Sequence, residues 1–559
     1  RLLTEAQLSS GGRADRFVAW DEATDRPAIY DPNTGQYERD GVMPSLFGVR
    51  SLEGTDGNKI TCKPVFERLG EIAVPFAPER SERIHRVPAN KVWQTALLLA
   101  HNRAVSMYMW NGLGQHTNAT QTSRAIACLY ALLGDFDRPG GNVIFPKVKV
   151  NEVDGKEFLP KEAAAARIGR ERKPLGPPAK PGNCAAYDVF AAIVEETPYP
   201  VKALLNFGSN TVMSTADSRR GRDAMKKLEF AVAADLFMTP TAELCDYVLP
   251  ATSFLEMSNM TTAFEHRQRG KTHLQYRAAV VEPLAERRSD TWIIFELAKR
   301  LGLGDKFWNG DIEAAYNYEL QPSGITLEEL KANPGGISRA IEPSYEKHAS
   351  SPTHPPLTKH VLSEVEGGET GGFNSSRSHE QVTRGFATPT KRVELYCKAF
   401  ADHGISPMPE YIEPAISPLS RPDLAAQFPL VLTNAKFTTY VHSQQRALPT
   451  LRKASPAPSA DIHPETALRY GVKNKQWMTV ESPRGAIRVK ARVTTDIIPD
   501  VICCQHGWWQ DCKVLELPGY NPYEPTGANP ATLIGTEIAD PVSGSLPHRS
   551  YLCRVKPAE

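Results

Sequence analysis

The sequence lacks any spacing of cysteine or histidine that would hold a metal ion. Its nine cysteines include no C-x-x-C pair, and its 14 histidines form neither H-E-x-x-H nor a Cys/His array. The cysteines lie mostly among apolar residues, which is typical of small buried side chains in a reduced protein. Cys503 and Cys504 are adjacent, so on a strand they would point to opposite faces. The sequence therefore assigns no metal ligand within this chain.

Two common functional motifs are also missing. No G-x-S-x-G nucleophile elbow occurs, which disfavours a hydrolase of that kind. The glycine spacing is not G-x-G-x-x-G, so nicotinamide binding of the usual type is disfavoured. The motifs in this chain therefore identify no catalytic residue.

Neither an excess of one charge nor a long apolar run is present. The 65 basic and 64 acidic side chains give a net charge of +1, which provides no electrostatic footprint for nucleic acid or an anionic membrane. We find no apolar run long enough to cross a bilayer, so direct membrane insertion is not expected. The chain starts at Arg1 with no methionine and no signal pattern, and we expect a further portion upstream. The choice between cytoplasm and periplasm stays open.

The middle of the sequence alternates between strands and helices. Residues 201–205, 230–234 and 247–249 read as strands, and residues 217–228 as a helix. Thr239 is a suitable N-cap and Pro240 a suitable first residue for a helix before the last of these strands. This alternation is typical of a parallel, doubly wound sheet.

A similar pattern precedes this region. Residues 91–102 predict a helix, residues 104–110 a strand, and residues 119–133 a helix that ends at Gly134. Another amphipathic helix is expected over 291–302. Glycine pairs within residues 348–378 indicate a flexible connection.

The pattern changes after about residue 425. Residues 428–432, 476–482 and 486–493 are strands, and the last two alternate apolar with polar side chains. Pro483, Arg484 and Gly485 join those two strands into a hairpin. An all-β domain follows from this pattern, and a closed barrel is its expected form.

At 559 residues the chain is too long for a single core, and several domains are expected. The predicted fold class is α/β, with doubly wound parallel-sheet domains followed by a C-terminal β-barrel domain. The predicted boundaries are an irregular excursion with the end of a first α/β segment over 1–80, part of an α/β dinucleotide-binding domain over 81–150, a second such domain over 151–420, and the barrel over 421–559.

Three loops after predicted strands carry small and amide residues: 111–116, 206–210 and 235–241. In an open α/β sheet, ligands bind beyond the carboxyl ends of the strands. Asp235 at a strand end can accept paired hydrogen bonds from a guanine-like N–H edge, and Asn and Gln offer both donors and acceptors. Helix N-termini at 117–120 and at Thr239 suit a pyrophosphate. One such loop can be a simple turn, but three together favour a site for a large phosphate-bearing cofactor.

Several segments occur in an order that resembles the molybdopterin oxidoreductase family. They are Trp110-Asn-Gly-Leu-Gly-Gln-His, Asp235-Leu-Phe-Met-Thr-Pro-Thr, Glu286-Arg-Arg-Ser-Asp, Leu432-Thr-Asn-Ala-Lys, and Gly527-Ala-Asn-Pro. This family is the dimethyl sulfoxide reductase superfamily, which includes formate dehydrogenases and periplasmic nitrate reductases. The resemblance covers nearly all of residues 60–559.

The resemblance implies two molybdopterin guanine dinucleotides that carry molybdenum or tungsten, held by two α/β domains and closed over by the barrel. By position in the motifs, it implies a set of cofactor-binding residues in the α/β part: Asn111, Gly112, Gln115, His116, Asn206, Gly208, Asn210, Asp235, Thr239, Thr241 and Asp290. In and after the barrel it implies Thr433, Lys436, His442, Ser443, Asn529 and Arg549.

Members of the family usually begin with a cysteine-rich segment for a [4Fe–4S] cluster and then supply a metal ligand, and neither is identifiable here. The resemblance therefore implies a catalytic subunit whose iron–sulfur and metal-ligand portion is not in this chain. Its partners would be a small-molecule substrate and an iron–sulfur electron-transfer subunit or segment, with no nucleic acid.

The implied function is a two-electron oxidoreductase acting in electron transport on a small substrate, like a formate dehydrogenase, nitrate reductase or thiosulfate reductase. Two alternatives stay open. One is a non-catalytic electron-transfer scaffold of a respiratory complex, and the other is a non-redox hydratase on the same fold. The sequence does not specify the substrate.

Overall fold

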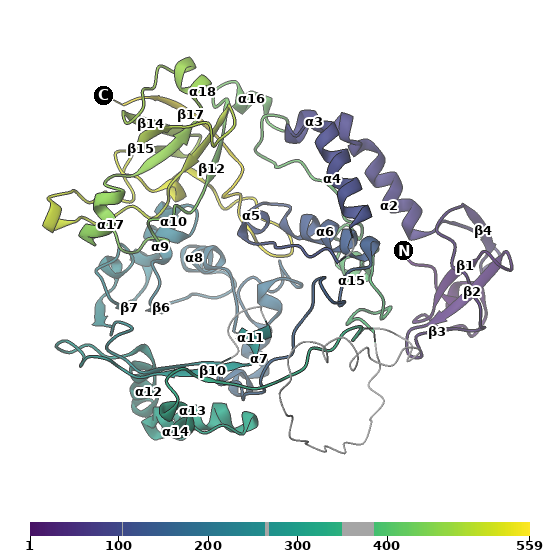
Figure 1. The fold of residues 1–559 in the computed structure, drawn as a ribbon, viewed down its shortest axis with the longest axis horizontal. Helices are drawn as coiled ribbons and strands as arrows, with labels where there is room; N and C mark the ends of the chain where they lie inside the picture. Colours follow the sequence, from purple (N-terminus) through teal and green to yellow (C-terminus); the bar gives the residue numbers. More distant parts are fainter. Residues whose placement is uncertain (103, 181, 263–267, 349–384, 559) are drawn as a thin grey trace, which may run out of the picture.

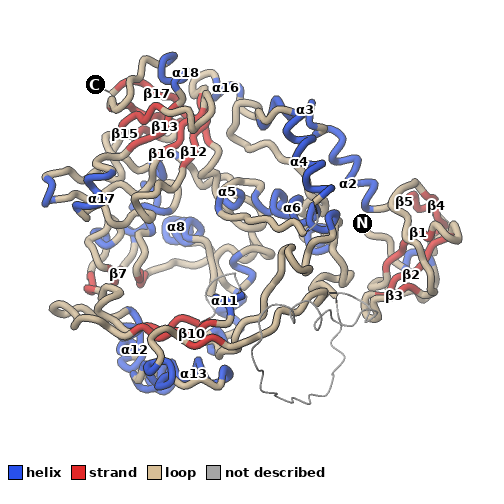
Figure 2. The backbone as a smooth tube through the Cα atoms, in the orientation of Figure 1, coloured by secondary structure: helices blue, strands red, loops and turns tan. Residues whose placement is uncertain are grey.

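The computed structural model describes residues 1–102, 104–180, 182–262, 268–348 and 385–558. The connection expected over 348–378 lies outside these ranges except for residue 348. Figure 2 shows the strands in separate groups, with the largest group forming the barrel near the C-terminus. The predicted domain boundaries stay predictions.

The first 60 residues form two small antiparallel sheets, so the expectation of an irregular excursion is wrong. One sheet has the order β1-β2-β3, and the other is the pair β4-β5. The segments 31–35 and 53–57, which contain Asp and Gly, lie in the turns of the β2–β3 and β4–β5 hairpins. The strands of these sheets are short and bury few residues, so they carry no long apolar pattern in the sequence. Their bounds are β1 Phe17–Asp21, β2 Arg26–Asp31, β3 Gln36–Tyr37, β4 Arg50–Glu53 and β5 Lys59–Cys62.

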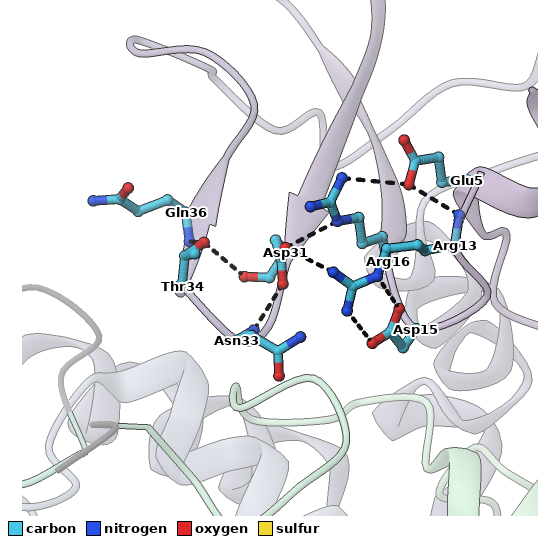
Figure 3. A network of polar contacts seen from close by, with 8 residues as sticks. All are labelled: Glu5, Arg13, Asp15, Arg16, Asp31, Asn33, Thr34 and Gln36. Carbon is cyan, nitrogen blue, oxygen red and sulfur yellow. Dashed lines mark hydrogen bonds and ion pairs between the residues drawn. The ribbon is translucent and has the colours of Figure 1, made fainter. Parts of the chain in front are cut away.

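A polar network fixes the turn between β2 and β3 (Figure 3). Asp31 accepts a hydrogen bond from the amide of Asn33 at 2.9 Å and from Nε of Arg16 at 2.9 Å. Arg13 and Glu5 extend the network on the far side of Arg16. These contacts are partly exposed and stabilise the local turn rather than a ligand site.

Three helices follow this region along one edge of the molecule (Figure 1): α2 Val65–Ala73, α3 Pro78–His85 and α4 Ala89–His101. The short helix α1 Glu5–Leu8 precedes β1, and α5 Asn111–Gly114 and α6 Ala119–Leu133 come after α4. The predictions for α4 and α6 are confirmed, and Gly134 ends α6 in the left-handed conformation, with φ of 70°. None of the side chains of α4 is buried, and Trp93, Leu97 and Leu98 are exposed.

The strand expected over 104–110 does not form. The amide of Val105 donates to the carboxylate of Asp135 at 3.1 Å, and the amide of Met107 donates to the side chain of Asn142 at 2.8 Å. The carbonyl of Met107 accepts from the hydroxyl of Tyr130 at 3.0 Å. Side chains thus take the hydrogen bonds that a neighbouring strand would take, and the apolar alternation alone did not reveal this. Residues 111–114, expected as a loop, form the single turn α5.

The central α/β unit is confirmed as a parallel sheet of order β6-β7-β8. Its parts are β6 Ala203–Phe207, β7 Phe230–Asp235, β8 Tyr247–Pro250, α8 Ala186–Glu195, α9 Thr211–Ser214 and α10 Ser218–Lys227. Asp217 caps α10 by accepting from the amide of Arg220 at 3.3 Å. The core under the sheet includes Phe190, Ile193 and Met225.

The helix predicted to start at Thr239 is wrong in length. A single 3-10 turn, η4 (Ala242–Leu244), lies between β7 and β8, and Thr241 is at its N-cap position. β8 begins at Tyr247, so the chain has too few residues for a longer helix. Thr239 still accepts a hydrogen bond from the amide of Ala242 at 3.2 Å.

A second lobe carries an antiparallel sheet of order β11-β10-β9 with helices beside it (Figure 1). The predicted helix over 291–302 is confirmed as α12, and Ser289 caps it. Leu274, Leu320, Leu327 and Leu330 form the core of this lobe. Its elements are β9 Asn259–Thr262, α11 Gln268–Lys271, β10 His273–Arg277, α12 Asp290–Arg300, α13 Ile312–Leu320, α14 Leu327–Ala332 and β11 Ile337–Ser338.

The C-terminal region is a closed barrel of order β12-β16-β13-β15-β14-β17, as predicted. The hairpin of β14 and β15 closes where Ser482 pairs with Gly485. The interior is filled by the largest core cluster of the molecule, in which Leu430, Ile462 and Met478 are fully buried. The strands are β12 Leu430–Asn434, β13 Ser459–Ile462, β14 Trp477–Ser482, β15 Gly485–Val493, β16 Val501–Cys504 and β17 Tyr551–Pro557. The remaining helices are α7 Lys161–Ala165, α15 Lys398–Asp402, α16 Pro422–Ala425, α17 Pro449–Ala454 and α18 Pro464–Arg469.

Candidate cofactor-binding site

The carboxyl ends of β7 and β8 open toward the start of α12. The amide of Ala251, just after β8, donates to the carbonyl of Asp235 at 3.1 Å. Ala251 also forms a bridge with Arg288, which brings the N-terminus of α12 to the edge of the sheet. Asp290 is the first residue of α12. The tertiary structure thus places the carboxylates of Asp235 and Asp290 near each other.

These two carboxylates are incompletely neutralised. Asp235 accepts hydrogen bonds at Oδ1 from the amides of Leu236 and Phe237, at 2.7 and 3.2 Å. Oδ1 of Asp290 is buried and has no hydrogen-bond partner among the described residues. Burial raises the pKa of Asp235, and burial together with the charge of Asp235 raises the pKa of Asp290. A ligand with N–H donors would satisfy the atom that the protein leaves unpaired.

Replacing Asp290 with asparagine is expected to stabilise the chain at neutral pH when no ligand is bound. Because the pKa of Asp290 is raised in the folded state, the folded chain binds more protons than the unfolded chain between the usual and the raised value. Stability is therefore lost as the pH rises through that window, and removing the charge recovers it. Thermal melting at pH 7 should show a higher Tm for Asp290→Asn.

The difference in Tm between Asp290→Asn and wild type should shrink as the pH falls below the usual pKa range of an aspartate. Asp290 is then protonated in both the folded and the unfolded chain. A Tm for Asp290→Asn that is equal to or below the wild-type value at pH 7 would contradict the conclusion that the charge of Asp290 destabilises the folded chain. Asp423, an exposed aspartate on α16 that is paired with Arg421, is a control position away from Asp235 and Asp290.

The loop after β6 is held by its own amides and by η4. Asn206 donates to the carbonyl of Ser209 at 2.7 Å, and its Oδ1 accepts from the hydroxyl of Thr211 at 3.1 Å. Thr241 donates through its hydroxyl to Oδ1 of Asn210 at 3.1 Å. Gly208 has φ of 53°, and a Cβ there would lie 4.0 Å from Oδ2 of Asp290. The loop therefore passes close to the carboxylate of Asp290.

The barrel reaches the same loop through Ser443. Nδ2 of Asn210 donates to the hydroxyl of Ser443 at 3.2 Å, and the indole of Trp509 donates to the carbonyl of Ser443 at 2.8 Å. Gly507 has φ of 80°, and a Cβ there would lie 2.5 Å from the carbonyl oxygen of His442. These contacts join the α/β sheet to two barrel loops.

A third contact joins the α5–α6 turn to the C-terminal end of the chain. Nε of Arg549 donates to Oε1 of Gln115 at 2.8 Å, and its Nη1 donates to the carbonyl of Asn434 at the end of β12. Nδ1 of His116 lies 3.3 Å from the hydroxyl of Ser550. Figure 1 shows α5 and α9 beneath the barrel, which agrees with these contacts.

The N-terminus of α6 does not offer the free amides that the sequence suggested for a pyrophosphate. Asp540 is buried, and its carboxylate accepts from the amide and the hydroxyl of Thr120 at 3.0 and 2.7 Å. A carboxylate of the chain itself thus occupies part of this helix terminus. The expectation was wrong for Thr120 because Asp540 is 420 residues away in the sequence.

Some predicted residues lie apart from these contacts. Asn529 is buried, and its side chain bonds Ser218, the carbonyl of Pro522 and the amide of Ala531. Thr239 is buried behind the loop that it caps. The other predicted residues are exposed or half-buried. Asn111 and Gly112 in α5 and Lys436 and His442 in the loop after β12 are exposed, and Thr433 in β12 is half-buried. Their assignment to a cofactor stays a prediction.

Sequence reasoning missed Arg446, His506 and His548, which the structure places near the predicted residues His442 and Arg549. Burial and the charges of Arg446, His442, His548 and Arg549 lower the pKa of His506 to about 4. Burial and Arg549 lower the pKa of His548 to about 4. No spacing in the sequence marks these side chains, because only the barrel brings them together. Within the described ranges, no group of three or more His, Cys, Asp and Glu side chains is placed to hold a metal ion.

A parallel sheet with carboxylates at its carboxyl edge, joined by hydrogen bonds to a barrel with amide and basic side chains, is typical of the class of α/β proteins that bind a ligand beyond their strand ends. Comparison with known families agrees. A profile described as "Molybdopterin oxidoreductase" matches residues 90–300, and one described as "Molydopterin dinucleotide binding domain" matches residues 430–551. The two matches together span more than half of the chain. The chain belongs to the molybdopterin oxidoreductase family, the dimethyl sulfoxide reductase superfamily.

Among curated proteins, the chain is similar to acetylene hydratase of Syntrophotalea acetylenica, with 28% identity over 79% of this chain and 59% of the hydratase. It is also similar to dopamine dehydroxylase of Eggerthella lenta, with 25% identity over 86% of this chain and 52% of the dehydroxylase. The chain thus spans little more than half the length of these relatives. The solved structure of acetylene hydratase from Pelobacter acetylenicus has the same fold, with a TM-score of 0.69 and 24% identity over 88% of this chain and 68% of that chain.

The described residues fit the molybdenum or tungsten molybdopterin cofactor that the dinucleotide-binding domain supports. Oδ1 of Asp290 and the hydroxyl of Thr252 are both buried and without a partner in the part of the chain that the structure describes. The amide of Thr252 bonds the carbonyl of Arg288, so both orphan atoms lie at the carboxyl edge of the sheet. A bound heterocycle with donors and acceptors would satisfy them. Among the described residues, no helix is both long enough and apolar enough to be a membrane span.

Proposed function

We propose that this chain binds two molybdopterin guanine dinucleotides with molybdenum or tungsten and forms the larger part of a two-electron oxidoreductase. Its reaction would resemble those of formate dehydrogenases, nitrate reductases or thiosulfate reductases, with a small molecule as substrate. The bound metal would supply the two-electron chemistry, and the chain would hold and orient the cofactor. A [4Fe–4S] cluster on a segment or partner outside this chain would carry the electrons onward.

The observation that supports this proposal most strongly is the pair of neighbouring carboxylates at the carboxyl edge of the sheet. Asp235 raises the pKa of Asp290, and one buried oxygen of Asp290 has no hydrogen-bond partner among the described residues. Two like charges at close range are costly without a ligand, whereas a guanine edge would donate N–H groups to such carboxylates. Gln115, Asn210 and Ser443 would contact the cofactor where the barrel meets the α/β part.

The proposal is tested by analysing the native protein for metal and nucleotide. Molybdenum or tungsten is expected at about one atom per chain, with two GMP released by acid hydrolysis. Neither metal, with no GMP, would count against the proposal. Two GMP without iron would leave the cofactor assignment intact and place the iron–sulfur centres elsewhere.

A non-redox hydratase is the second candidate, because acetylene hydratase is similar to this chain in both sequence and fold. Addition of water to a substrate needs no net transfer of electrons, whereas the reaction of an oxidoreductase transfers two electrons to or from its substrate. Assays with and without an electron donor or acceptor therefore distinguish a hydratase from an oxidoreductase. Turnover that needs neither would favour the hydratase, and turnover that needs one would favour the oxidoreductase.

A further inference from the structure

Glu256 is a buried carboxylate in the loop after β8 and is not among the predicted cofactor-binding residues. Only 7% of Glu256 is exposed. Its Oε2 accepts from the amide of Ser253 at 2.7 Å, within the same loop. Its Oε1 accepts from the amide of Leu284 at 2.9 Å, and Nη1 of Arg287 donates to both carboxylate oxygens at 3.0 and 3.2 Å. Glu256 thus joins the loop after β8 to the segment that leads into α12.

The hydrogen bonds of Glu256 keep its carboxylate ionised at neutral pH. The amides of Ser253 and Leu284, together with Arg287, lower the pKa of Glu256 to about 2. Hydrogen bonds to an ionised acceptor are about twice as strong as those between neutral groups. The contacts between the two segments are therefore at full strength at pH 7.

The segment 281–288 has no buried residue of its own. Leu284 is 65% exposed, so hydrophobic packing does not fix the turn that it begins. Ala285 has φ of 55°, a left-handed conformation that is unfavourable for a residue other than glycine. Among the described residues, Glu256 supplies the hydrogen bonds that join the turn over 284–287 to the rest of the chain. These bonds therefore hold the turn against its local preference.

The segment that Glu256 holds leads directly to Asp290. The bridge between Ala251 and Arg288 comes next along the chain, and Asp290 is the first residue of α12. A Cβ on Gly208 would lie 4.0 Å from Oδ2 of Asp290, so the start of α12 is also close to the loop after β6. A displaced turn would therefore displace the carboxylate of Asp290 relative to its neighbours.

The environment of Asp290 depends on this placement. Burial is the first cause of the raised pKa of Asp290, and the charge of Asp235 is the second. Both causes weaken if the start of α12 moves toward solvent, because burial decreases and the distance to Asp235 increases. The stability of the chain with and without the charge of Asp290 thus reports where that side chain lies.

We propose that Glu256 is a positioning residue that holds the turn over 284–287 and thereby keeps the carboxylate of Asp290 buried near Asp235. For its functional consequence the proposal rests on the proposed function, because Asp290 is one of the predicted cofactor-binding residues. Glu256 itself would touch no cofactor. It acts through the backbone that joins the turn to α12.

The test is a double-mutant cycle of thermal melting at pH 7 on the full chain freed of cofactor. Asp290→Asn is expected to raise the Tm of the wild-type chain, because it removes a buried charge. With Glu256→Gln or Glu256→Asp already present, we expect the gain in Tm from Asp290→Asn to fall by at least half. A purely structural role of Glu256 would lower the Tm with and without Asp290→Asn and leave the gain unchanged.

The two Glu256 variants separate position from charge. Glu256→Gln keeps the length of the side chain but removes its charge, which leaves the guanidinium of Arg287 without a partner carboxylate. Glu256→Asp keeps the charge but is too short to reach both segments. A positioning role predicts a smaller gain in both variants. A smaller gain in Glu256→Gln alone would assign the effect to the charge of Arg287 and overturn the inference. If Glu256→Gln does not fold, Glu256→Asp decides.

Asp21→Asn is the matched control. Asp21 is a buried carboxylate at the end of β1, and it also accepts from two backbone amides, those of Ala23 and Met43 at 3.1 and 2.9 Å. Arg39 donates to it at 3.0 Å. Asp21→Asn should lower the Tm and leave the gain from Asp290→Asn at its wild-type size. Equal gains in wild type, in the Glu256 variants and in Asp21→Asn would overturn the inference.

The outcome for Glu256 is separable from that for the proposed function. The melting cycle needs no cofactor, so a smaller gain in both Glu256 variants supports the positioning role even if the native protein holds no molybdenum, tungsten or GMP. An unchanged gain, or no gain from Asp290→Asn in the wild-type chain, overturns the inference. The metal and GMP content of the native protein then decides the proposed function by itself.

Discussion

Replacing Asp235 with asparagine is expected to reduce the retention of guanine dinucleotide by about a hundredfold. A carboxylate at the end of β7 can accept two N–H groups of a guanine edge, whereas an asparagine side chain presents its own NH₂ to one of them. Hydrogen bonds to a charged group contribute about 1.5–3 kcal/mol each, and about 1.4 kcal/mol is a factor of ten in binding. The measurement is GMP released per mole of purified chain, together with its molybdenum and tungsten content.

Asp246, just before β8, provides a matched control at the opposite edge of the same sheet. Its Oδ2 accepts from the amide of Ala231 at 2.7 Å, so it makes a backbone contact of the same kind as Asp235. Asp246→Asn should lower stability slightly and leave the GMP content unchanged. Equal GMP content in Asp235→Asn and wild type would show that this carboxylate does not hold the nucleotide.

Replacing Gly507 with alanine is expected to cost about 3 kcal/mol of folding free energy and to displace the loop that carries His442 and Ser443. Gly507 has φ of 80°, where an L-residue costs about 1–2 kcal/mol. The added Cβ would lie 2.5 Å from the carbonyl oxygen of His442 and 2.6 Å from Cα of Ser443, so backbone must move. Overpacking of this kind costs about 1–3 kcal/mol more. Thermal melting measures the first effect and GMP content the second.

Gly471→Ala is a control that separates the cost of the left-handed backbone conformation from the cost of the steric clash at Gly507. Gly471 lies in the same barrel domain with φ of 65°, and a Cβ there would meet nothing within 4 Å. Only the cost of the left-handed conformation, about 1 kcal/mol, is expected, with GMP content as in wild type. If both variants lose the same Tm and keep the same GMP content, the contact between the two loops has no role in holding the cofactor.

The sequence predicts those helices and strands whose cap or turn residues lie next to a clear apolar pattern. The helix α6 ended at Gly134 as expected, and the hairpin of β14 and β15 closed at Gly485, because cap and turn residues act within a few positions. The strands β6, β7 and β8 were found from their apolar runs. The small N-terminal sheets were missed, since only a few of their residues, such as Ala28 and Tyr30, are buried.

The same contrast applies to the candidate site. Asp235 and the loops around Asn111 and Asn206 stand out in the sequence because each follows a predicted strand or carries a family motif. The pairing of Gln115 with Arg549 and of Asn210 with Ser443 was not predictable, since these partners are more than 200 residues apart. The occupation of the α6 terminus by Asp540 was hidden for the same reason.

The sequence by itself determined the family, the α/β units followed by a barrel, and the strand-end aspartate, because periodicity, caps and motifs are encoded over short stretches of chain. Only the tertiary structure decided that Asp290 lies near Asp235, and that Arg446 bonds the carbonyl of His506. Charge and hydrogen bonding between distant residues depend on distances in space, and closure of the barrel and the bridge between Ala251 and Arg288 set those distances.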